Sequence, residues 1–417
     1  MKIILALLLN AGLLWLLWRW LPRVRQLPQV GRWVLPTLAL KLLATAITLV
    51  VLTEDATYFL DWSRRMTDQL WQAPGQWLQM LLTDEFHWQG AKLVFHGFSN
   101  TLFIIKLLSV LNLGSLGSGW LNALYLSVFS FVGGWELVRQ LQRLWPGAVP
   151  LAGVGAFLLW PTVVYWTSGL TKESLLVGSS ALVLAAVLRL AYGPPVGRAW
   201  VVVGLLAAAL LHFKMRYFFA VVLFGVLAGL GLIRVFQAMQ LARKRLVQLA
   251  LLLALLAGGG WVAGEMSTLF RPNKFTSQLQ RNYTALLRVS LDRPHLRYPD
   301  LQPTTASVVR HAPLAALNTL ARPWPWEGDS LRYVAAGLEN LLLLALLGVA
   351  LVAVVRGHAG RLPFAVVAAL LLYCLLLAAL LGLTTPNLGT LSRYRTTFLP
   401  FLLLLLLQND YARRWLK

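Results

Sequence analysis

Two adjacent acids, Glu54 and Asp55, stand where a long apolar run ends and the aromatic and charged stretch LTEDATYFLDW begins. A carboxylate at a membrane surface can serve as a general base when it lies within hydrogen-bond reach of the proton that it removes. A partly dry interface would raise its pKa. The same residues can instead start a helix, since Thr53 and Asp55 are good N-cap residues and acids favour the first helical turn. Both interpretations stay open here, and we prefer Asp55 over Glu54 as the base.

Two arginines, Arg393 and Arg395, stand at the entrance of the last long apolar run. Two guanidinium groups can bind a phosphate or diphosphate in a bidentate manner. Asn387 and Gly389 come shortly before them, and a glycine allows the backbone to approach an anion closely. The alternative is that these arginines extend to lipid headgroups and bind no substrate.

Two shorter stretches also place cations between apolar runs. In SGLTKES, Lys172 stands at the start of an expected span, where an anion would meet a helix N-terminus. Glu173 is a weaker candidate, and a helix cap with a Lys–Glu pair is the alternative. In HFKMRYF, Lys214 and Arg216 interrupt an otherwise apolar region. Such cations are costly in a membrane unless they face a polar cavity.

Familiar motifs for cofactors and metals do not occur in the sequence. It has no Walker loop, GxSxG, HExxH or paired-cysteine metal pattern. The single cysteine, Cys374, permits no internal disulfide. We therefore expect no cofactor, although a requirement for a divalent cation stays open. Four histidines lack ligand spacing and are interpreted as structural: His87, His96, His295 and His311.

The composition is that of an integral membrane protein. Of the 417 residues, 58% are hydrophobic and 12% are charged, whereas soluble proteins carry about 25% charged residues. The net charge of +22 is better explained by basic cytoplasmic loops than by nucleic-acid binding, which we do not expect. The first apolar run follows Lys2 and is not followed by a small-residue cleavage site, so we expect it to be retained as a span.

Apolar runs of spanning length predict an all-α polytopic membrane protein with about eleven transmembrane helices. A shorter run at 101–113 must be re-entrant, interfacial or part of a broken span if the basic clusters are to lie on one side of the membrane. The expected spans are 3–20, 33–53, 118–138, 150–167, 174–192, 199–213, 217–236, 247–264, 332–355, 362–384 and 396–409.

This topology divides the chain into five parts. Between the spans it places an outer loop with two amphipathic interfacial helices, WSRRMTDQLWQAPGQWLQMLL and FHWQGAKLVF, with a break at Pro74–Gly75. It also places a Pro- and Arg-rich, irregular outer segment that we expect to act as a lid. The parts are 1–53 (two spans), 54–100 (outer loop), 101–264 (central bundle), 265–331 (lid loop) and 332–417 (C-terminal spans).

The assembled pattern resembles the membrane glycosyltransferases of the GT-C class, in which a catalytic acid opens a large outer loop with membrane-lying helices. LTEDATYFLDW matches that arrangement, with Tyr58 as the aromatic residue that follows the acids. FLLWPTVVYWTSGLTKESLL and PNLGTLSRYRTTFLPFL are similar to stretches of bacterial envelope glycosyltransferase-like proteins. The motifs are short and degenerate. One departure is that the acidic loop follows the second span here, whereas in the class it usually follows the first.

The resemblance implies a metal-independent, inverting transfer of a sugar or oligosaccharide from a polyprenyl phosphate or diphosphate donor. The acceptor would be a lipid, glycan or protein at the outer face of a bacterial plasma membrane. Asp55 or Glu54 would activate the acceptor hydroxyl. The phosphate would be bound by residues drawn from Arg393, Arg395, Lys172, Lys214, Arg216, Asn387 and Tyr58. A transporter or flippase of a lipid-linked or anionic solute, and a non-catalytic scaffold, are the alternatives.

Overall fold

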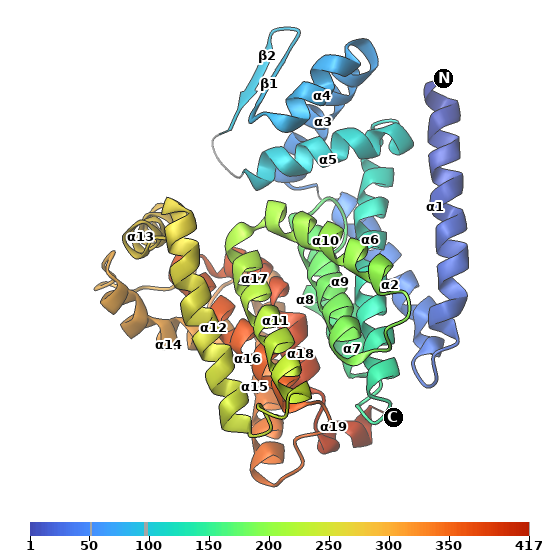
Figure 1. Ribbon diagram of the computed structural model, residues 1–417. Helices are drawn as coiled ribbons and strands as arrows, with labels where there is room; N and C mark the ends of the chain where they lie inside the picture. Colours follow the sequence, from blue (N-terminus) through green and yellow to red (C-terminus); the bar gives the residue numbers. More distant parts are fainter. Residues whose placement is uncertain (51, 96–98, 417) are drawn as a thin grey trace. The chain divides into compact units, whose positions relative to one another are not determined.

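The chain is a multi-pass helical membrane protein, as its composition predicts. The computed structural model describes residues 1–50, 52–95 and 99–416 (Figure 1). Nine helical segments in these ranges are long and apolar enough to cross a membrane: α1 (Lys2–Arg25), η1 with α2 (Gly31–Val50), α6 (Gly119–Leu144), α9 (Lys172–Tyr192), α10 (Arg198–Met215), α11 (Tyr217–Ala238), α12 (Arg245–Met266), α15 (Leu331–Val355) and α16 (Phe364–Thr384).

Two of the eleven expected spans, 150–167 and 396–409, consist of shorter helices, so the expected count is not confirmed. The first is interrupted at Pro161, which has no N–H to continue the preceding helical turn. The pieces of the first are α7 (Ala152–Val154), the π-helical turn η2 (Gly155–Leu159) and α8 (Pro161–Trp166). The short helices in and next to the expected span 396–409 are η4 (Arg395–Thr397), α18 (Leu399–Leu406) and α19 (Asp410–Trp415).

The helices form two compact units. The first unit comprises Met1–Gln140, Val164–Ala186 and Pro194–Ala220. The second unit comprises Leu141–Val163, Val187–Gly193 and Val221–Lys417. The acid pair and Lys172, Lys214 and Arg216 belong to the first unit, whereas Asn387, Arg393 and Arg395 belong to the second.

The first predicted amphipathic helix, WSRRMTDQLWQAPGQWLQMLL, lies in two helices of the first unit that are divided at the predicted break. Helix α3 (Glu54–Gln72) buries Phe59, Leu60 and Met66, which recur at the spacing of one helix face. It ends before Pro74, which occupies the first position of α4 (Pro74–Leu82). The buried side chains of both helices join one apolar cluster with those of α5, so the segment packs within the unit rather than forming a core of its own.

The prediction of a helix for FHWQGAKLVF was wrong. These residues lie largely in a β-hairpin, in which β1 (Glu85–Trp88) pairs antiparallel with β2 (Ala91–Val94). Gln89 and Gly90 join the strands with φ angles of 47° and 78°. Positive φ at both central residues is the geometry of the tight turns that match strand twist. The strands bury Phe86 and Leu93, which are register partners on the same face.

Helix α5 (Asn100–Ser115) packs against α3 and is too short to cross a bilayer upright. Its 16 residues span roughly 24 Å at 1.5 Å per residue, against about 30 Å of hydrocarbon. In Figure 1 it runs crosswise to α1 and α6 of the same unit. Polar bonds join it to α3: Thr67 Oγ1 donates to Ser109 O (3.1 Å), and Asn112 Nδ2 donates to Thr67 Oγ1 (3.0 Å). This geometry fits the interfacial interpretation of 101–113.

The segment 265–331 in the second unit is more regular than predicted. It contains η3 (Thr268–Phe270), α13 (Pro272–Arg288) and α14 (Thr305–Ala321). Helix α14 lies directly on α16, where a Cβ at Gly382 would stand 2.4 Å from the Ala315 carbonyl oxygen. Thr319 Oγ1 also donates to Ala378 O at 2.9 Å. The expectation of an irregular segment was therefore wrong.

Candidate functional site

The two acids of the first unit occupy the first turn of α3. Thr53 is the N-cap, and its side-chain oxygen accepts a hydrogen bond from Ala56 N at 3.3 Å. Glu54 and Asp55 follow it, and both are exposed. Because Thr53 performs the capping, the carboxylate of Asp55 is not needed for that task. Both acids still benefit from the positive end of the helix dipole.

Tyr58 lies one turn further along α3 and is 38% exposed. Its ring contacts those of Phe59 and Trp62, with centroid separations of 6.4 and 6.2 Å. These contacts make it part of an aromatic face of α3. The rest of the ring is exposed, and its role in binding a substrate stays a prediction.

Lys172 begins α9 and joins three elements of the first unit. Its Nζ donates to Asn100 Oδ1 and Thr101 Oγ1, both at 2.8 Å. The same ammonium lies 5.1 Å from the centre of the Phe59 ring, a cation–π distance. Phe59 is four residues after Asp55 on α3, which is roughly 6 Å along the same helix face. Lys172 is therefore held near the acid-bearing end of α3, and the neighbouring Glu173 is fully buried.

A cavity of about 510 Å³ connects α4, α5 and the end of α10. We call it the lysine groove, because two lysines lie on its otherwise largely apolar wall: it is lined by Leu82, Leu102, Phe103, Lys106, Leu107 and Lys214, among others. An apolar wall with two cations is the chemistry that an anionic amphiphile needs. Arg216, the C-cap residue of α10, instead lies 4.9 Å from the Phe219 ring.

Lys106 is the more enclosed of the two cations in the lysine groove. Its Nζ donates to the carbonyl oxygens of Leu81, at 3.2 Å, and of Thr83. Burial lowers the pKa of Lys106, Asp84 opposes that change, and the positive charge of Lys214 adds to it. Like charges held at one groove raise the affinity of that groove for an anion.

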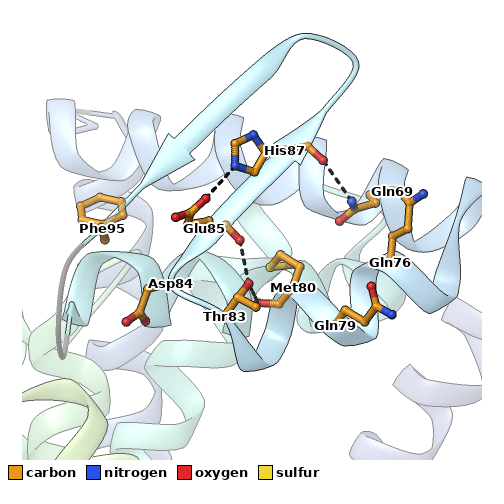
Figure 2. A pocket seen from close by; sticks show the side chains of 9 residues that line it. All are labelled: Gln69, Gln76, Gln79, Met80, Thr83, Asp84, Glu85, His87 and Phe95. Carbon is orange, nitrogen blue, oxygen red and sulfur yellow. Dashed lines mark hydrogen bonds and ion pairs between the residues drawn. The ribbon is translucent and has the colours of Figure 1, made fainter.

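A second cavity of about 510 Å³ lies between α3, α4 and the hairpin. We call it the polar groove, and its polar lining consists mainly of Gln69, Gln76, Gln79, Asp84, Glu85 and His87. Figure 2 shows Asp84 toward one end and Gln76 toward the other. His87 Nε2 and Glu85 Oε2 are 2.9 Å apart, so one wall carries an ion pair when the imidazole is protonated.

The two grooves share wall residues. Thr83 and Asp84 line both of them. Ser99 also lines the lysine groove and precedes Asn100, the residue that Lys172 binds. Within the first unit, Lys172 thus links the acid-bearing helix α3 to the start of α5, where the lysine groove lies. The lysine groove in turn adjoins the polar groove through Thr83 and Asp84.

The candidate residues of the second unit have mainly internal roles. Asn387 caps α17 (Leu388–Tyr394): its Oδ1 accepts from Thr390 N at 2.9 Å, and its Nδ2 donates to Ser290 Oγ at 3.1 Å. Arg393 lies in the last turn of α17 and is half-buried.

Arg395 is only 1% exposed. Burial lowers its pKa, and the nearby carboxylate of Glu339 opposes that change. Thr162 in turn donates a short hydrogen bond to Glu339. Arg395 and Glu339 thus form a buried electrostatic group within the second unit, rather than an exposed phosphate clamp.

Sequence reasoning missed most of the groove residues. Lys106, Asp84 and the glutamines stand in no motif, and the sequence does not show that they meet. The available clue was the hairpin pattern, in which a Gln–Gly pair separates two short apolar stretches. His87 was interpreted as structural but lines the polar groove, whereas His295 and His311 bond backbone oxygens. His96 lies outside the described residues.

No protein-family model, curated protein or solved structure matches this chain. Within 1–50, 52–95 and 99–416, no three side chains of His, Cys, Asp or Glu gather as a metal site would require. The two grooves and the acids of α3 are therefore the features from which a function can be inferred.

Proposed function

We propose that the protein is a membrane glycosyltransferase that takes a sugar or oligosaccharide from a lipid-linked phosphate donor. The donor would be a polyprenyl phosphate or diphosphate sugar, and the transfer would take place at the outer face of a bacterial plasma membrane. Asp55 would be the general base, with Glu54 beside it. The proposal draws on the first unit.

The lysine groove is the observation that carries this proposal. A lipid-linked phosphate has an apolar tail and an anionic head, and the groove offers Leu and Phe side chains next to Lys106 and Lys214. A site for a soluble nucleotide sugar would not need an apolar wall of this kind. Ser99 of the groove precedes Asn100, which binds Lys172, and the Lys172 ammonium lies against the ring of Phe59, four residues after Asp55.

The transfer balances without a further reactant. The acceptor hydroxyl gives its proton to the Asp55 carboxylate as its oxygen forms a bond to the anomeric carbon of the sugar. The bond from that carbon to the phosphate oxygen breaks, and the electron pair leaves with the phosphate. Attack from the side opposite the phosphate inverts the configuration at the anomeric carbon.

The cations act on the charge that develops as the phosphate leaves. Interactions that strengthen only in the transition state are the ones that accelerate a reaction. In this proposal Lys106 and Lys214 would make such interactions, and Lys106 would do so in addition to its bonds to the carbonyl oxygens of Leu81 and Thr83. Lys172, which donates to Asn100 and Thr101, would position α3 against α5. Loss of one preorganised donor typically costs about 100- to 1000-fold in turnover.

The test is donor consumption by the purified chain in nanodiscs, with a panel of radiolabelled polyprenyl-linked sugars and candidate acceptors. Asp55→Asn should lower consumption by at least about 100-fold in a folded protein. Asp68→Asn is the matched control, because Asp68 is also an exposed acid of α3 but lies 13 residues further along. Equal consumption by Asp55→Asn and Asp68→Asn would remove Asp55 from the mechanism. Donor binding without consumption by any variant would favour a transporter or a scaffold.

A further inference from the structure

The polar groove continues into another cavity along the hairpin. We call this cavity, of about 490 Å³, the hairpin cavity. It shares Gln76 and His87 with the polar groove, and its lining also includes Trp88, Gln89 and Lys92. Each of the two cavities falls in the size range of ordinary ligand sites, about 300–1,000 Å³. Together they form an elongated polar surface, which suits a chain-like ligand better than a small compact one.

The lining is rich in groups that pair with hydroxyls. A glutamine amide offers two N–H donors and a carbonyl acceptor, and a carboxylate offers only acceptors. A sugar hydroxyl both donates and accepts hydrogen bonds. Two neighbouring hydroxyls can therefore form two hydrogen bonds with the two polar atoms of one amide or carboxylate. Gln76 and Gln79 are exposed on α4, and Asp84 and Glu85 are exposed at the start of the hairpin. Trp88 adds an aromatic side chain, and aromatic rings provide an apolar surface for packing.

One of these amides is already fixed in position. Gln69 is only 3% exposed, and its Nε2 donates to His87 O at 3.3 Å. Within the described part of the chain, no hydrogen bond reaches its Oε1. A buried amide oxygen without a donor is unfavourable, so Gln69 keeps an unused acceptor beside the groove.

We propose that the polar groove and its continuation along the hairpin bind a neutral glycan chain. The charges disfavour an acidic glycan, because Asp84 and Glu85 line the polar groove and its described lining includes no lysine or arginine, unlike that of the lysine groove. His87 is 2.9 Å from Glu85 and offsets one of these charges only when it is protonated. Lys92 lines the hairpin cavity and does not line the polar groove.

The groove would hold the part of the glycan that is remote from the reacting end. Gln69 follows Asp55 by 14 residues on α3, which is roughly 21 Å along the helix axis. Thr83 and Asp84 connect the groove to the lysine groove, so a glycan several sugars long could extend from one to the other. The role of this glycan as the acceptor depends on the proposed transfer, whereas its binding does not.

The experiment measures binding without any donor. The full chain in nanodiscs is titrated calorimetrically with maltohexaose, cellohexaose and chitohexaose, and with the corresponding disaccharides. We expect at least one hexasaccharide to bind, and its disaccharide to bind more weakly. Gln76→Ala should weaken the binding about fivefold, as for the loss of one hydrogen bond. Because Gln76 is exposed, its substitution should not disturb the fold.

Gln278→Ala is the matched control, since Gln278 is an exposed helical glutamine of the second unit. The titration contains no donor, so a failed transfer reaction would leave this result unaffected. The proposal would be overturned if no hexasaccharide bound at millimolar concentration, or if Gln76→Ala and Gln278→Ala bound equally well. If transfer were observed without glycan binding, the acceptor would bind elsewhere.

Discussion

Replacing Lys214 with methionine should weaken the binding of a phosphate-bearing lipid to the lysine groove. The substitution keeps an unbranched, flexible side chain next to Leu82 and Phe103 and removes only the charge and its N–H donors. Lys214 is exposed, so we expect little effect on folding. Lys106→Met is a less suitable test, because Lys106 also binds the carbonyl oxygens of Leu81 and Thr83.

The magnitude follows from the exposure of Lys214. A hydrogen bond to a charged group contributes about 1.5–3 kcal/mol, and water around an exposed lysine favours the lower end of that range. Since about 1.4 kcal/mol corresponds to a tenfold change in affinity, Lys214→Met should raise the dissociation constant roughly tenfold. Added salt should reduce the difference, because exposed charges are screened.

The assay is a titration of the detergent-solubilised protein with a fluorescent phosphatidic acid, competed with unlabelled phosphatidic acid or phosphatidylcholine. Phosphatidic acid supplies a phosphomonoester on a lipid, and phosphatidylcholine supplies a zwitterionic head on the same tails. Lys274→Met is the control, since Lys274 is an exposed lysine of α13 in the second unit. Equal affinities for Lys214→Met and Lys274→Met, or no preference for phosphatidic acid, would refute the assignment of the groove.

Three further predictions concern the acids, the helix packing and the pH dependence. Asp55→Asn should lower turnover about 100- to 10,000-fold with little loss of thermal stability, whereas Thr53→Ala should cost about 1 kcal/mol of stability and retain turnover; the reverse pattern would make the acids structural. Gly133→Ala should destabilise the chain by about 1–3 kcal/mol, because the new Cβ would stand 2.5 Å from the carbonyl oxygen of Gly178. Gly204→Ala should not, because a Cβ there would meet no atom within 4 Å. Chemical unfolding of the two variants tests the difference. Burial lowers the pKa of Lys106 from the usual 10.5, so its ammonium loses its proton at a lower pH than that of a free lysine. The affinity for phosphatidic acid should therefore fall as the pH rises through this lowered pKa, and an affinity independent of pH up to 10.5 would contradict the prediction.

The membrane-spanning helices could be predicted because each one is encoded locally. An apolar run of sufficient length is visible in the sequence, and nine of the expected spans form single long helical segments. The break between α3 and α4 was also predictable, since Pro74 cannot continue a helix. The two spans that do not form single helices contain local interruptions, such as Pro161, whose effect depends on the surrounding packing.

The hairpin and the grooves depend on contacts between distant residues. Phe86 and Leu93 are seven residues apart and fit one helix face as well as a strand pair, whereas Phe86 and Trp88, two residues apart, share a face only in a strand. The Gln89–Gly90 turn decides for the hairpin, because it reverses the chain after four residues of strand. Lys106 and Lys214 are far apart in the sequence, and they meet only because α5 and the end of α10 line one groove.

Burial also separates the predicted phosphate-binding residues. Arg395 and Lys172 looked equivalent in the sequence, as cations beside apolar runs. The structure buries Arg395 near Glu339, whereas it gives Lys172 two defined acceptors near the acids of α3. A cation that lies close to its own counter-charge has less to offer a substrate.

The most direct test of the proposed transfer is the chemical identity of the lipid after the reaction. The wild-type chain in nanodiscs is incubated with a polyprenyl-linked sugar and a glycan acceptor, and the products are separated by liquid chromatography and identified by mass spectrometry. A transferase yields free polyprenyl phosphate or diphosphate together with an acceptor that is heavier by the transferred sugar unit, and Asp55→Asn yields neither. An unchanged lipid-linked sugar, recovered in full with every donor and acceptor of the panel, would contradict the proposal.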